Sequence, residues 1–212
     1  MVSGLVIGYD PGGNDAHGVA ELRVKDGKVT QVSTHTMKTV EAVIRFLEAR
    51  PSVAAIGVDT LTCWSTGPSG WRPADRWLRD LPRYRAVQNS ITSPNSLFGS
   101  MGLNGMAVLV AVRHRHPDLV ITETHPKVVY YHFSGEKYDY ENAKLLMDTT
   151  LGDRLGVTVA PANEHEWDAA LSAFAALEGS AGRWTKDLHR LATTEGERLL
   201  QPCGETHYYW PE

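Results

Sequence analysis

The chain has 212 residues, with 21 Lys and Arg against 25 Asp and Glu, and its formal net charge is −4. This balance excludes a wholly basic nucleic-acid binder but is compatible with a local basic strip. The hydrophobic content of 42% is that of an ordinary globular protein. Cys63 and Cys203 form no CxxC pattern, which argues against a cysteine-based zinc site or a disulfide framework.

The apolar segments of the sequence predict neither a signal peptide nor a membrane-spanning helix. Residues 1–5 lack the basic start and long apolar stretch of a signal peptide. The longest apolar run, residues 106–112, is too short to cross a bilayer. We therefore expect a cytoplasmic protein without membrane association. The sequence leaves its oligomeric state open.

Three strands are predicted at the start of the chain, at residues 5–10, 19–24 and 29–34. The first is an apolar run and the second alternates apolar and polar residues. A turn is predicted over residues 11–15, and Asp26-Gly27 is a hairpin signal between the second and third strands. Together these segments predict a three-stranded antiparallel meander.

A helix and a buried strand follow. Val40, Val43, Ile44 and Leu47 have helical spacing, and Thr39 precedes them as a candidate N-cap. Residues 53–58 form a continuous apolar run. A strand that is apolar on both faces is typical of parallel pairing, so we expect it to lie beside the first strand.

Residues 60–103 are predicted to be a long insertion, rich in Gly, Pro and Ser, with a short helix at residues 74–81. A fifth strand is expected at residues 119–123 and an irregular aromatic segment at residues 130–140. Asn163 and Glu166 have the spacing of a capping box at the start of a helix. Further helices are predicted at residues 104–115, 142–152, 163–177 and 185–200, the last followed by a tail to residue 212.

This order of elements predicts a single α/β domain. Its centre is a five-stranded mixed sheet, made of the meander and two parallel strands, with helices on both faces.

Acidic residues end several of the predicted strands. Asp10, Asp59 and Glu123 end the first, fourth and fifth strands, at the edge where ligands bind in open α/β sheets. Asp168 lies in the helix at residues 163–177, and His165 lies on the same face of that helix. If the helix packs beside the first strand, the carboxylates converge. Each acid taken alone is equally a turn former or a helix cap.

Converging carboxylates repel one another unless a cation compensates them. Oxygen ligands of this kind suit Mg²⁺ or Mn²⁺. Two such ions can stabilise the attacking and leaving oxygens of a phosphodiester during hydrolysis. The acids therefore predict a magnesium or manganese site with two ions.

The arrangement resembles the ribonuclease H-like superfamily, whose catalytic acids lie in the first strand of a meander, after the fourth strand and in a late helix. The matching segments are Ile7-Gly8-Tyr9-Asp10, Ile56-Gly57-Val58-Asp59 and residues 165–171. The His-x-x-Asp start of the late helix resembles Holliday-junction resolvases of the RuvC kind.

Over residues 4–178 the chain more closely resembles an uncharacterised family of predicted nucleases, domain-of-unknown-function family 429. That family has an acid-x-His-Pro element after the fifth strand and an Arg-x-x-Asp-Arg element in the insertion. Many members have a Cys before the insertion Asp, where this chain has Ala74, so no thiol role carries over. The matching segments are Glu123-Thr124-His125-Pro126 and Arg72-Pro73-Ala74-Asp75-Arg76.

The resemblance implies a divalent-metal-dependent nuclease acting on DNA or RNA. In this interpretation Asp10 contacts both metal ions, and Asp59 and Asp168 are flanking ligands. Glu123 is a fourth ligand or an orienting acid, and His165 is a ligand or a proton relay.

Basic residues of the insertion are candidates for holding the substrate. Arg72 and Arg76 are predicted to position phosphate, and His125 to contact the substrate or move a proton. Solvated ion pairs on a helix are the alternative for the arginines. Lys127, Lys137 and Lys144 are further candidate phosphate contacts.

Two other functions remain open. One is a noncatalytic ribonuclease H-like module that binds nucleic acid or a protein partner. The other is half of an actin-like ATPase, because Asp10-Pro11-Gly12-Gly13 is similar to the phosphate loop of that group, whose members need two such domains. The sequence has no G-x-S-x-G element and no Walker A element.

Overall fold

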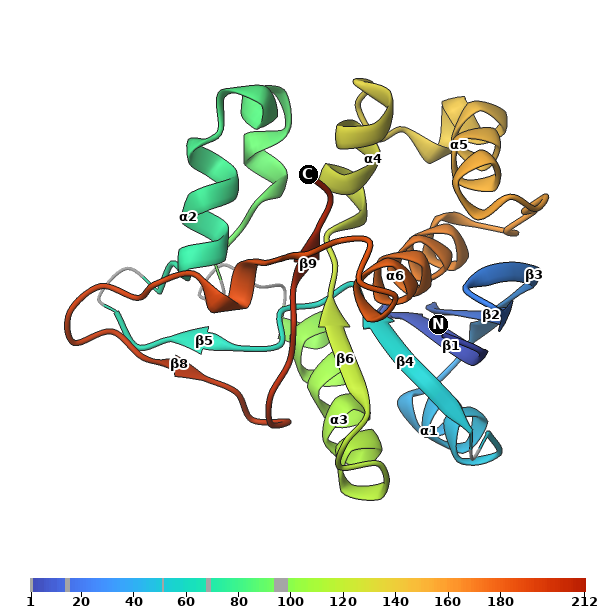
Figure 1. The fold of residues 1–212 in the computed structure, drawn as a ribbon, viewed down its shortest axis with the longest axis horizontal. Helices are drawn as coiled ribbons and strands as arrows, with labels where there is room; N and C mark the ends of the chain where they lie inside the picture. The colour runs from blue at the N-terminus through green and yellow to red at the C-terminus, as the bar shows by residue number, and fades with distance from the viewer. Residues whose placement is uncertain (1, 14–15, 51, 68–69, 94–98) are drawn as a thin grey trace.

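A five-stranded mixed sheet forms the centre of the protein (Figure 1). The computed structural model describes residues 2–13, 16–50, 52–67, 70–93 and 99–212. The strand order is β3-β2-β1-β4-β6, with antiparallel pairing from β3 to β1 and parallel pairing from β1 to β6. This confirms the predicted α/β class with a five-stranded mixed sheet. The strands are β1 (Gly4–Asp10), β2 (His17–Lys25), β3 (Lys28–Met37), β4 (Val53–Val58) and β6 (Val120–Glu123).

The two faces of the sheet have separate apolar cores. Helices α1 (Val40–Glu48) and α3 (Gly99–Arg115) cover one face, where Ile7 and Tyr9 of β1 lie. Helix α6 (Glu164–Ser180) covers the other face, where Val6 lies. Because side chains alternate along a strand, Asp10 shares the α6 face with Val6 and Gly8.

Glycines let α6 lie directly on the sheet. Gly8 and Gly57, on the neighbouring strands β1 and β4, face the backbone carbonyls of Ala169 and Ser172. A Cβ atom at these glycines would lie 1.7 and 1.8 Å from those carbonyl oxygens. Gly18 of β2 has a similar contact with the carbonyl of residue 165. A side chain at any of these three glycine positions would therefore push the helix away.

The start of α6 is anchored to the edge of the sheet. The Asn163 side chain accepts a hydrogen bond from the Glu166 amide, as the capping pattern predicts. In a capping box the Glu166 carboxylate would also accept a hydrogen bond from the Asn163 amide. Here it accepts instead from the Thr34 and Thr36 hydroxyls of β3 and from the Ala162 amide. The predicted capping box is therefore only half correct.

Two more helices lie beyond α6, and one of them corrects the sequence analysis. Helix α4 (Pro126–Ser134) occupies part of the segment expected to be irregular, and α5 (Tyr140–Leu155) follows. Pro126 at the first position and Gly135 in the left-handed region, with φ of +74°, delimit α4. The aromatic residues of the segment are largely packed into the core, which stabilises a helix that the sequence pattern does not show.

The insertion contains more structure than predicted. It holds β5 (Trp64–Ser65), α2 (Pro73–Asp80) and the 3-10 helix η1 (Pro82–Ser90). Helix α2 lies one residue before its predicted position. Among the described residues, none of the helices combines the length and hydropathy of a membrane span. The turn predicted over residues 11–15 lies partly outside the described residues.

The helix predicted over residues 185–200 is wrong. The chain there forms β7 (Lys186–Asp187), the 3-10 helix η3 (Leu188–Arg190) and β8 (Leu199–Leu200). Strand β7 pairs with β9 (Tyr209–Trp210), and β8 pairs with β5. The C-terminal segment thus crosses the carboxyl end of β6 (Figure 1). Its backbone groups bond to distant segments, and these bonds replace those of a helix.

Candidate active site

Asp10 and Asp59 are brought together by parallel strands. Tyr9 of β1 pairs with Val58 of β4, and each aspartate follows directly. The Asp59 amide donates a hydrogen bond of 2.9 Å to the Tyr9 carbonyl, which holds the two strand ends in register. Asp10 is buried and Asp59 is partly buried. The predicted convergence of these two acids follows from the sheet itself.

Asp168 joins them from α6. The helix lies close to β1 and β4 over the glycines Gly8 and Gly57, and Asp168 is buried in the second turn. Burial, followed by the charges of Asp59 and Asp10, raises the pKa of Asp168 well above its usual range. Burial and then the charge of Asp10 do the same for Asp59. The three carboxylates therefore lie within electrostatic reach of one another.

Two carboxylate oxygens in this cluster lack a hydrogen-bond partner within the described ranges. Asp10 Oδ1 and Asp168 Oδ1 are buried and accept no hydrogen bond from the described residues. A buried carboxylate oxygen left this way is costly, and a divalent cation is the usual compensation. Aspartate oxygens are also the ligands that Mg²⁺ and Mn²⁺ prefer. Asp10, Asp59 and Asp168 therefore fit a divalent metal site.

His165 lies at the edge of this cluster. Its Nδ1 atom is 2.7 Å from Asp10 Oδ2, and the imidazole is partly exposed. The hydrogen bond to Asp10 raises the pKa of His165 above its usual value. The charge of Lys127, which is exposed at the start of α4, lowers the pKa values of all three aspartates against the larger effect of burial.

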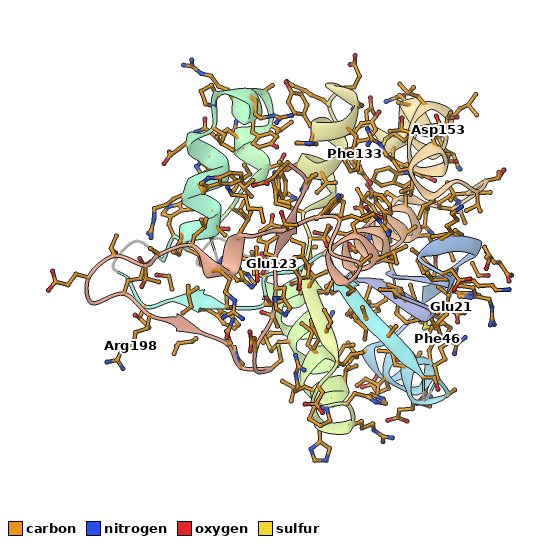
Figure 2. The ribbon with its side chains drawn as sticks, viewed as in Figure 1. Glu21, Phe46, Glu123, Phe133, Asp153 and Arg198 are labelled. Carbon is orange, nitrogen blue, oxygen red and sulfur yellow. The ribbon has the colours of Figure 1, made fainter. Side chains whose placement is uncertain are left out.

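Glu123 lies within electrostatic reach of Asp59, but its side chain leaves the sheet on the opposite face. It pairs in register with Val58, so it shares the face of Val58, whereas Asp59 is one residue further and points the opposite way. Figure 2 places Glu123 near the middle of the molecule, where the C-terminal segment crosses the end of β6. Only 2% of Glu123 is exposed.

The partners of Glu123 form a buried ionic network. Arg72 Nη2 is 2.6 Å from Glu123 Oε1 and 2.7 Å from Asp75 Oδ1, and Arg72 Nη1 is 2.8 Å from Glu123 Oε2. The Thr62 amide and hydroxyl also donate to Glu123 Oε2. Although burial alone would raise it, the charge of Arg72 holds the pKa of Glu123 well below its usual range.

Arg72 and Arg76 do not face an external phosphate in this arrangement. Arg72 is 1% exposed, and its guanidinium is taken up by Asp75 and Glu123. Arg76 pairs with Glu197 at 2.7 Å and donates to the Trp71 carbonyl. Both arginines thus hold the insertion against the rest of the protein. The sequence pattern of alternating charges does not distinguish this use from phosphate binding.

A second group of ligand atoms belongs to the same network. Cys63, Glu123 and His189 bring one ligand atom each within 4.8 Å of one another. Arg72 Nη1 lies 3.4 Å from Cys63 Sγ and also bonds Glu123, so a guanidinium already supplies positive charge between them. Sequence analysis did not identify His189, since no motif links it to Glu123.

A cavity of about 290 Å³ adjoins Asp59 and contains the remaining predicted residue. His125 lines it, and its Nε2 atom is 2.7 Å from the Ser90 carbonyl, to which it donates. Burial lowers the pKa of His125, which favours the neutral imidazole. Lys127 also lines the cavity. His125 and Lys127 therefore lie beside Asp59, and Arg72 and Glu123 of the buried network line another part of the same cavity.

Comparison with known proteins adds two structural neighbours. No protein-family model and no curated protein matches the sequence, so the closer resemblance to family 429 stays a prediction. The RuvC structure from Thermus thermophilus aligns with a TM-score of 0.47 at 16% identity, covering 84% of this chain and 96% of that chain. T. thermophilus RuvC in complex with a Holliday junction substrate aligns with a TM-score of 0.49 at 18% identity, with the same coverage.

Proposed function

We propose that the protein hydrolyses phosphodiester bonds of nucleic acid with divalent metal ions held by Asp10, Asp59 and Asp168. The observation that carries this proposal is that two buried oxygens in a cluster of three carboxylates, Asp10 Oδ1 and Asp168 Oδ1, accept no hydrogen bond from the residues that the structure describes. Such a cluster is unfavourable without a cation. Mg²⁺ or Mn²⁺ bound there supplies Lewis acidity for the attack of water on the phosphorus.

The side chains around the aspartates have distinct roles in this proposal. Asp59 interacts electrostatically with both Asp10 and Asp168, so the three carboxylates would hold the metal ions together, with Asp10 at the end of the central strand β1. His165 orients Asp10 through its bond of 2.7 Å and presents its other ring nitrogen as a proton relay. Lys127 binds a phosphate oxygen at the rim.

A different glutamate takes the place expected for Glu123. Glu164 lies one residue before His165, and its charge raises the pKa of Asp10, although burial is the larger cause. Glu123 is fully engaged by Arg72 and Thr62. We therefore propose Glu164 as the fourth acid of the site and Glu123 as a structural residue.

Nucleic acid is the proposed substrate because its backbone linkage is a phosphodiester. Lys127 lines the cavity beside Asp59 and gives a local positive charge next to the carboxylates, although the net charge of the chain is acidic. The noncatalytic binding module is the alternative that the test below separates.

Hydrolysis of bis(p-nitrophenyl) phosphate and of labelled DNA and RNA oligonucleotides, with Mn²⁺, Mg²⁺ or EDTA, tests this function. We expect metal-dependent cleavage, and at least a hundredfold loss in Asp59→Asn. The exposed Asp118→Asn is the matched control and retains the wild-type rate. Metal-independent cleavage, or equal rates in Asp59→Asn and wild type, contradicts the proposal. Bound Mn²⁺ without cleavage of any substrate favours the noncatalytic module.

A further inference from the structure

The cavity beside Asp59 has a position and a composition that the hydrolytic site does not explain. It is bounded by the loop after β4, the end of η1 and the start of α4, with Asp59 and Lys127 among its lining residues. Its volume of about 290 Å³ is at the small end of ligand pockets, which range from about 300 to 1,000 Å³. It therefore holds one small group next to the carboxylates.

Two threonines of the cavity wall have unused hydroxyls. Thr60 and Thr124 both line the cavity and are 7% and 3% exposed. Neither Oγ1 atom has a hydrogen-bond partner in the part of the chain that the structure describes. A hydroxyl both donates and accepts, and leaving it buried and unpaired is unfavourable. These two groups point to a polar ligand rather than to simple packing.

Part of the wall is apolar, with Leu61, Ile91, Met101 and Tyr208 among its residues. The ion pairs of Arg72 with Asp75 and Glu123 form another part of the wall, and these three side chains already satisfy one another. Apolar walls with a few placed polar groups are the usual composition of a small-molecule pocket. A flat group with polar edges suits this lining, because its faces contact the apolar side chains while its edges bond to the hydroxyls.

We propose that this cavity receives the base of an unpaired nucleotide whose phosphate lies at Asp59 and Lys127. This inference rests on the proposed function, because the group attached to a nucleic-acid phosphodiester is a nucleoside. A base in a duplex has its edge bonded to its partner and its faces stacked, so it enters such a pocket only when unpaired. The substrate class is therefore single-stranded or otherwise unpaired nucleic acid.

Nucleoside binding tests the pocket without phosphate or metal. Saturation-transfer NMR titrations in EDTA compare adenosine, guanosine, cytidine and uridine with ribose. We expect at least one nucleoside to bind tenfold more tightly than ribose. Thr60→Val and Thr124→Val should each weaken that nucleoside about threefold to tenfold, because each removes one hydrogen bond. The exposed Thr193→Val is the matched control and should leave the affinity unchanged.

A further variant tests the pocket independently, in case Thr60→Val or Thr124→Val does not fold. Thr92 lines the cavity and is only partly buried, so Thr92→Phe should fill the space and abolish nucleoside binding with little effect on folding. Nucleosides that bind no better than ribose, or that bind equally to Thr92→Phe, overturn the inference. The nucleosides carry no phosphate and the titration contains no metal, so it tests the pocket even if the protein hydrolyses no phosphodiester. If the protein is an active nuclease but binds no nucleoside, the base pocket is contradicted and the proposed hydrolysis is not.

Discussion

The buried charge of Asp168 destabilises the folded protein when no metal ion is bound. One of its oxygens is buried without a hydrogen-bond partner among the described residues, and burial and the charges of Asp59 and Asp10 raise its pKa. The substitution Asp168→Asn removes the charge and keeps the shape. In EDTA we expect it to stabilise the protein by about 1–2 kcal/mol, which raises Tm by a few degrees.

The measurement is differential scanning calorimetry at pH 8, with Asp118→Asn as control because Asp118 is exposed. The control should melt within about 1 °C of wild type. Mn²⁺ should raise the Tm of wild type and leave Asp168→Asn almost unchanged. A lower Tm for Asp168→Asn in EDTA would mean that its carboxylate is a structural acceptor.

Glu123 is the opposite case, a buried acid whose charge is satisfied. Glu123→Gln leaves Arg72 buried with Asp75 as its single acidic partner, and breaking a buried pair this way costs about 3–5 kcal/mol. We expect the free energy of unfolding in urea to fall by that amount. Glu136→Gln, on the surface, is the control. If Glu123→Gln instead abolishes Mn²⁺ binding without loss of stability, Glu123 is a ligand after all.

At the scale of elements, the distance between α6 and the sheet determines the site. Gly57→Ala places a methyl group where the Ser172 carbonyl oxygen lies, at 1.8 Å. Helix α6 must move, and Asp168 moves with it. We expect a loss of about 3 kcal/mol or more and at least a tenfold loss of Mn²⁺ affinity by calorimetric titration, although no ligand is changed.

The control for this prediction is Gly135→Ala. Gly135 has a φ of +74° and open space around it, so alanine there adds backbone strain but does not touch α6. It should lower Tm and keep the Mn²⁺ affinity of wild type. Equal Mn²⁺ affinities in Gly57→Ala and wild type would show that helix placement does not control the site.

The sequence predicts the elements that carry this site because their signals are local. Apolar runs define β1 and β4, and their parallel pairing brings Asp10 and Asp59 together. Glu123 differs from the aspartates for a reason that the sequence also contains, since it occupies the same position in its strand as Val58 and not the position that follows. Counting the alternation of side chains, as well as the strand ends, would have separated it from the aspartates.

At the scale of the whole molecule, the C-terminal segment completes the buried network, and no local pattern predicts this. His189 is 126 residues from Cys63 in sequence, yet its Nε2 atom lies 3.6 Å from Cys63 Sγ and 3.4 Å from Glu123 Oε2. The helix predicted there was wrong because pairing with β5 and β9 outweighs helical propensity. The burial of Arg72, which was predicted to position phosphate, likewise depends on distant segments, since Glu123 is one of its partners.

Because of this network, we expect the stability of the protein to fall at alkaline pH. Although burial lowers it, contacts with Cys63 and Glu123 raise the pKa of His189 to about 10. The unfolded value is about 6.5, so the stabilisation is complete below that pH and is lost as the pH rises through 10. Between pH 7 and pH 10.5 we expect the free energy of unfolding to fall by a few kcal/mol more in wild type than in His189→Gln. The exposed His114→Gln should follow wild type, and parallel profiles for His189→Gln and wild type would contradict the assignment.

The central claim is that Asp10, Asp59 and Asp168 hold divalent metal, and anomalous diffraction from crystals soaked in Mn²⁺ tests it without any choice of substrate. We expect peaks about 2.0–2.6 Å from carboxylate oxygens of these three residues, and none at Glu123. Peaks only among Cys63, Glu123 and His189, or no peak at the aspartates, would contradict the account.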